Sequence, residues 1–88
     1  MNVTFSHVRV GTTNAAIFDA DSRSRTPKDR DALLADLTAR VRASGLRVDR
    51  AVLAFRKGSR IVYYGDRELV RYLNRNVISI PWNHRLSV

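Results

Sequence analysis

Two runs near the start of the chain combine apolar and β-branched residues in the short stretches typical of β-strands. Residues Val3–Val10 and Asn14–Ala20 are separated by the turn-forming tetrad Gly11-Thr12-Thr13-Asn14, so the pattern predicts a β-hairpin. Alternate residues of a strand point to opposite faces, and both faces of the second run are largely apolar. We therefore expect the second strand to lie in the interior of a sheet.

The next periodic segment predicts an amphipathic helix. Thr26 can cap its start, Pro27 suits the first helical position, and Gly45 suits the left-handed residue that ends a helix. One apolar stripe recurs at helical spacing and consists of Leu33, Leu34, Leu37 and Val41. The start, the stripe and the end agree, so a helix is expected over residues 27–44.

A second hairpin is predicted around Lys57-Gly58, where glycine allows the positive φ of a two-residue turn. We place Arg56 opposite Ser59, which puts the better core face on Ala51, Leu53, Phe55, Arg60, Val62 and Tyr64. The opposite face is apolar in its middle and basic at its ends, and it holds Arg50, Val52, Ala54, Arg56, Ser59, Ile61 and Tyr63.

A second helix is predicted after Gly65, capped by Asp66 and ended by Asn76. Its apolar side consists of Leu69, Val70 and Leu73. Arginines spaced four residues apart line up along another side of the helix, at Arg67, Arg71 and Arg75. Val77–Ile80 is expected to form a short strand that Pro81 ends.

This order of elements predicts one α+β domain over residues 1–88. The expected architecture is a two-layer sandwich in which an antiparallel sheet carries two helices on one face, ferredoxin-like with an extra N-terminal strand. Two ββα units in tandem are the alternative. Helices on one face leave the other face open, where Val52, Ile61 and Tyr63 would form an exposed apolar patch. Such a patch predicts a protein interface, and we expect a homodimer.

Composition narrows the classes of partner. The formal charge is +8, and residues after position 46 contribute most of it, with nine Arg or Lys against three acidic residues. A basic field concentrates polyanions, so nucleic acid, DNA or RNA, or an acidic protein is the expected partner. The bias of Arg over Lys is equally typical of a GC-rich genome. Without cysteine, disulfides, thiolate zinc sites and a cysteine nucleophile are excluded. No apolar segment approaches the length of a membrane span, and a cytoplasmic location is expected.

The arginine row on the second helix is the main candidate for function. Arginine binds phosphates bidentately, so we expect this row and the basic hairpin tip to follow a nucleic-acid backbone, through Arg67, Arg71, Arg75, Arg56, Lys57 and Arg60. An ordinary solvated helix face is the alternative interpretation. Aromatic residues interleaved with arginine would either stack on bases or fill the core; they are Tyr63, Tyr64, Tyr72 and Trp82.

One pair of carboxylates suggests catalysis. Asp19 and Asp21 stand at the end of a predicted strand and could share Mg²⁺ in a divalent-metal-dependent nuclease, or they could pair with neighbouring arginines or the start of the first helix. The histidines, His7 and His84, lie in unrelated elements. We expect a binding protein rather than an enzyme, with no cofactor.

The segment Ile17–Phe55, with FDADS, an arginine-containing helix and GLRVDRAVLAF, loosely resembles a family of small CRISPR-associated proteins and their toxin relatives. Those proteins are ferredoxin-like dimers with an Asp at the end of the first core strand. This chain departs from their pattern because another strand precedes the motif. The resemblance implies the same fold class and a role for Asp19.

Overall fold

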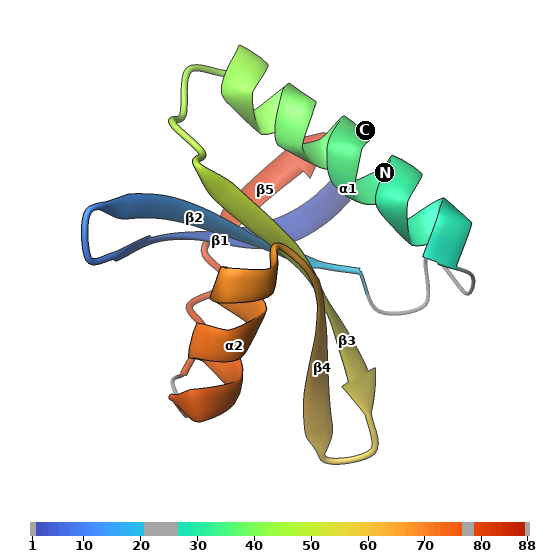
Figure 1. The fold of residues 1–88 in the computed structure, drawn as a ribbon. Coiled ribbons are helices and arrows are strands. Elements are labelled where there is room, and N and C mark those ends of the chain that lie inside the picture. The colour runs from blue at the N-terminus through green and yellow to red at the C-terminus, as the bar shows by residue number, and fades with distance from the viewer. Residues whose placement is uncertain (1, 21–26, 77–78, 88) are drawn as a thin grey trace.

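The computed structural model describes residues 2–20, 27–76 and 79–87 (Figure 1). Within these residues, five strands and two helices follow one another: β1 (Asn2–Val10), β2 (Thr13–Asp19), α1 (Pro27–Ala43), β3 (Arg50–Lys57), β4 (Arg60–Gly65), α2 (Arg67–Arg75) and β5 (His84–Ser87). The predicted α+β class is confirmed. The helix expected over residues 27–44 is also confirmed, as α1, which ends one residue earlier.

All five strands form one sheet in the order β4-β3-β2-β1-β5. The pairs β1-β2, β1-β5 and β3-β4 are antiparallel, whereas β2 and β3 are parallel. α1 makes the crossover between these parallel strands and returns the chain to the end of the sheet where β2 began. The prediction of a fully antiparallel sheet is therefore wrong, and the strand order is not the ferredoxin-like one.

The two helices cover opposite faces of the sheet, as Figure 1 shows with α1 above and α2 below the central strands. On β3, Leu53 and Phe55 pack in the cluster under α1, while Val52 and Ala54 pack in the cluster under α2. The prediction that both helices share one face is wrong, because β2 and β3 are apolar on both faces and each face needs a cover. No sheet face is left open over Val52, which is fully buried.

The β3-β4 hairpin turns at Gly58-Ser59, one residue later than predicted, with Lys57 opposite Arg60. Its register is therefore shifted by two residues from the predicted pairing. A shift of two preserves which side chains share a face, since side chains alternate with period two. The predicted face assignment is confirmed: Phe55 lies opposite Val62 and Leu53 opposite Tyr64.

The last strand lies further along the chain than predicted. Val77 and Ile78 lie outside the described residues, and Ser79 and Ile80 are not in a strand. β5 instead pairs with β1, where the His84 ring stacks on Phe5 with centroids 5.0 Å apart. Ile80 packs against the hydrophobic cluster under α2, so the chain covers part of the core here before it enters the sheet as β5. Within the described residues, neither helix is long and apolar enough to cross a membrane.

Candidate nucleic-acid interface

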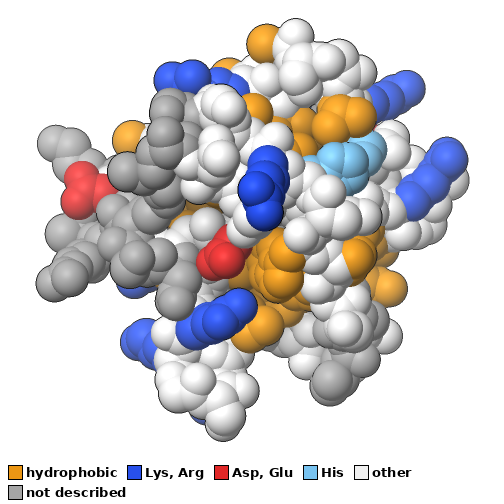
Figure 2. Space-filling view, turned by 180° about the vertical axis from the view of Figure 1, so that it is seen from behind, with side chains coloured by type: hydrophobic (Ala, Val, Ile, Leu, Met, Phe, Trp, Pro, Cys, Tyr) orange, Lys and Arg blue, Asp and Glu red, His pale blue; other side chains and the backbone are white. Residues whose placement is uncertain are grey.

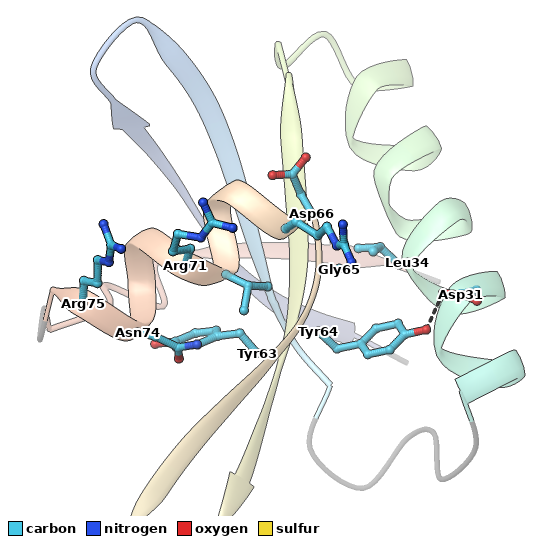
Figure 3. Close-up of a pocket in the computed structure, with 11 residues that line it drawn as sticks. Asp31, Leu34, Tyr63, Tyr64, Gly65, Asp66, Arg71, Asn74 and Arg75 are labelled. Carbon is cyan, nitrogen blue, oxygen red and sulfur yellow. Dashed lines mark hydrogen bonds between the residues drawn. The ribbon is translucent and has the colours of Figure 1, made fainter.

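A groove with a volume of about 1020 Å³ runs beside β4, the strand at one edge of the sheet. Its lining comes from both helices and from β4, and consists of Asp31, Leu34, Tyr63, Tyr64, Gly65, Asp66, Arg67, Val70, Arg71, Asn74 and Arg75. Because α1 and α2 lie on opposite faces, a groove that both helices line must follow the sheet edge. Figure 3 shows this arrangement, with α1 and α2 on either side of β4.

The start of α2 is fixed to the sheet by two acidic residues that share a single arginine. The Asp66 carboxylate caps the helix by accepting the Leu69 N–H at 3.0 Å. Arg50 Nη1 donates to both Asp66 oxygens at 3.0 Å, and its Nη2 lies 3.1 Å from Glu68. The hydrogen bond that Arg50 donates to Asp66 raises the pKa of Arg50. Both carboxylates at this end of α2 therefore contact Arg50, which offsets one of their two negative charges.

Gly65 lets the chain pass from β4 directly into α2. Its φ is +142°, a conformation that favours glycine. A Cβ at this position would lie 2.7 Å from the Ala51 carbonyl oxygen and 2.8 Å from Leu34 Cδ2. The backbone of β4, the backbone of β3 and a side chain of α1 meet here, so α2 begins immediately at the sheet edge.

The predicted arginine row borders this groove. Arg67, Arg71 and Arg75 are exposed, and all three line it. Among the residues that the structure describes, none of them makes an ion pair. Figure 3 shows Arg71 and Arg75 projecting from the same side of α2. The opposite side of the helix is anchored in the core by the buried Leu69 and Leu73.

The basic hairpin tip is separate from the groove. Arg56, Lys57 and Arg60 are exposed, but none of them lines it. Lys57 and Arg60 share the α1 face, whereas Arg56 lies opposite Ile61 on the α2 face. Figure 1 shows the hairpin and α2 extending from the sheet in the same direction. The six predicted contacts thus form one row and a separate tip.

Basic side chains elsewhere are dispersed. On the face shown in Figure 2, Lys and Arg side chains are scattered, one near the middle and others toward the edges, with hydrophobic side chains visible between them. Two exposed arginines outside the row are paired with carboxylates, since Arg40 lies 3.0 Å from Asp36 and Arg47 lies 3.6 Å from Asp49. The row on α2 differs in having three arginines beside one groove.

Two polar residues that line the groove, Asp31 and Asn74, were not predicted from the sequence as site residues. The Tyr64 hydroxyl donates to Asp31 Oδ1 at 2.6 Å, and this bond raises the pKa of Tyr64. Burial raises the pKa of Tyr63. Asn74 lies beside the arginines because it follows Arg71 by three residues, and this helical spacing could have identified it. No comparable local pattern indicates Asp31, which lies on the other helix.

The predicted apolar interface requires a correction. Val52 is buried beneath α2 and Tyr63 is half-buried, because α2 covers the sheet face that was expected to be open. Ile61 remains exposed at 41%, and its neighbour Val62, which the sequence did not single out, is exposed at 39%. Two of the three exposed large hydrophobic side chains among the described residues therefore lie on β4.

The residues of the metal-dependent alternative do not form a described metal site. Asp19 ends β2, where its carboxylate accepts the Thr4 hydroxyl at 3.4 Å, and Asp21 lies outside the described residues. Within the described part of the chain, no three His, Asp or Glu residues gather as metal ligands. His7 Nε2 lies 2.7 Å from the Arg47 carbonyl oxygen.

Comparison with known proteins finds no matching family model, no matching curated protein and no matching solved structure.

Proposed function

We propose that this protein binds nucleic acid through its phosphates, which contact the arginine row on α2. The observation that carries the proposal is the combination of position and charge: Arg67, Arg71 and Arg75 line one groove, and none of them is paired with a described carboxylate. Guanidinium groups form bidentate hydrogen bonds with phosphate oxygens, so a row of them suits a polyphosphate backbone.

The surroundings of the row support this proposal. Asp66 and Glu68 both contact Arg50, which reduces their repulsion of a phosphate. The overall charge of +8 attracts a polyanion from a distance. Phosphate contacts position a protein on nucleic acid without reading its sequence, so we expect binding that depends little on sequence.

The test is a comparison of two triple variants with the same net charge. Arg67, Arg71 and Arg75 are changed to Ala in one, and Arg9, Arg40 and Arg85, which do not line the groove, are changed to Ala in the other. Binding of labelled DNA and RNA is followed by fluorescence anisotropy. Because charge-assisted hydrogen bonds each contribute about 1.5–3 kcal/mol, the α2 variant should lose at least about tenfold in affinity.

The control variant should lose less than about threefold, because only the long-range field of the protein changes. Equal losses in the two variants would show that the groove is not the contact surface, and a wild-type protein without affinity would refute the function itself. Polyglutamate added as competitor distinguishes phosphate recognition from binding of an acidic protein.

A further inference from the structure

The outer edge of β4 presents unpaired backbone groups. The Asp66 N–H donates to the Ala51 carbonyl oxygen at 3.2 Å, which continues the ladder of hydrogen bonds between β3 and β4. This bond fixes which residues of β4 direct their backbone N–H and C=O groups toward β3. Even-numbered residues of β4 therefore face β3, and Ile61 and Tyr63 direct their N–H and C=O groups outward. Among the described residues, no backbone hydrogen bond outside the strand ladders uses these groups.

The same edge is unusually apolar. Ile61 and Val62 are two of the three large hydrophobic side chains that are exposed among the described residues. Edge strands of soluble proteins are normally protected by proline, lysine or a covering element, because unpaired edges recruit other strands. Within β4 only Arg60 supplies a charge, and no proline interrupts the strand.

We propose that a second copy of this chain pairs antiparallel with β4 and forms a twofold homodimer with one continuous sheet. Outward-facing residues must pair with outward-facing residues. The register that covers both exposed hydrophobic side chains places Ile61 opposite the partner's Tyr63, and Val62 opposite the partner's Val62 on the twofold axis. Arg60 then lies opposite the partner's Tyr64. This proposal goes beyond nucleic-acid binding and does not depend on it.

Charge complementarity favours a second copy as the occupant. Tyr64 lies on the α1 face, where its hydroxyl binds the exposed carboxylate of Asp31. The partner's Arg60 would lie on the same face beside Tyr64, within reach of that carboxylate. Asp31 makes no ion pair with any described residue, so it can accept this one. Because the dimer is twofold symmetric, this ion pair would form twice.

The dimer would also change the cationic surface. A twofold axis between antiparallel neighbouring strands is perpendicular to the sheet, so both copies of α2 lie on one face of the continuous sheet. Their arginine rows border the same junction, because each row lines the groove beside its own β4. A polyanion bound there would contact both subunits and would strengthen the dimer through the linkage between the two equilibria.

The test is the solution mass of the full chain without nucleic acid, measured by sedimentation equilibrium. Wild type should be a dimer at high micromolar concentration. Ile61→Pro removes an outward N–H and leaves the β3 ladder intact, so it should give a folded monomer. Ile61→Thr is the matched control because it keeps the N–H and the β-branch, and it should stay dimeric.

Charge reversal gives a second, independent test. Asp31→Arg should raise the dimer dissociation constant about tenfold or more, because two symmetry-related pairs become repulsive, and combining it with Arg60→Asp should restore the dimer. A monomeric wild type, a dimer that Ile61→Pro leaves intact, or a charge swap without recovery overturns the proposal. A monomer that still binds nucleic acid through α2 would overturn the dimer alone, and a dimer without such affinity would overturn only the proposed function.

Discussion

Replacing Gly65 with alanine tests the contact that sets α2 against the sheet edge. The added Cβ would meet the Ala51 carbonyl oxygen at 2.7 Å, Leu34 Cδ2 at 2.8 Å and Val52 Cα at 3.0 Å. Two of these three atoms belong to backbone of β3, which cannot move without disturbing its pairing with both β2 and β4. The leucine side chain can adjust, but the strand cannot.

The expected cost follows from two contributions. A φ of +142° strains any residue with a Cβ, by about 1–3 kcal/mol. Overpacking a close contact costs about another 1–3 kcal/mol. Gly65→Ala should therefore lower the free energy of unfolding by about 2–6 kcal/mol, a large share of the 5–15 kcal/mol typical of native proteins. At roughly 4–8 °C per kcal/mol for a domain of this size, the melting temperature should fall by at least about 8 °C.

Thermal and urea unfolding, followed by circular dichroism, measure this cost. Gly58→Ala is the matched control, since Gly58 also has a positive φ, +62°, but its Cβ would meet nothing within 4 Å. The control should lose only the backbone contribution, about 1–2 kcal/mol. If both variants lost the same stability, the close approach of β3, β4 and α1 at Gly65 would be refuted.

Three further variants test other contacts. Asp66→Ala should lower the free energy of unfolding by about 1 kcal/mol through loss of the α2 cap, and Asp66→Ser should recover most of it; urea unfolding measures both. The Asn14 backbone N–H lowers the pKa of Asp49, so Asp49→Ala should destabilise the protein at neutral pH, and this difference should vanish as pH falls below about 4. A hydrogen bond to Asp31 raises the pKa of Tyr64, so the destabilisation caused by Tyr64→Phe should be present below about pH 10 and shrink above it. In either pH series, a difference in stability that does not change with pH would contradict the hydrogen bond in question.

Local patterns in the sequence were sufficient to predict the first four strands and both helices, but not β5. The α1 stripe places Leu37 and Val41 in the core, and the interior position predicted for β2 is confirmed between β1 and β3. Spacing by four along α2 is enough to put Arg67, Arg71 and Arg75 on one side of the helix. These features depend on period and capping within single segments, and both are properties of neighbouring residues.

The arrangement of the elements in space was harder to predict from the sequence. Apolar residues on both faces of β3 indicate burial on both sides, but they do not say which helix covers which face or which strand is the neighbour. β5 has four residues, too few for a period to stand out, and its pairing with β1 joins the two ends of the chain. The groove combines Asp31 with Arg75 across three elements, so no local pattern could predict it.

The salt dependence of nucleic-acid affinity tests the central claim most directly. Each phosphate neutralised by arginine contributes about −0.9 to the slope of log K against log salt on duplex DNA. If the row on α2 makes three such contacts, changing Arg67, Arg71 and Arg75 to Ala should make the slope shallower by about 2.7, while the triple change of Arg9, Arg40 and Arg85 should leave it nearly unchanged. A wild-type affinity that does not respond to salt, or a slope that the α2 variant shares with wild type, would contradict phosphate binding by this helix.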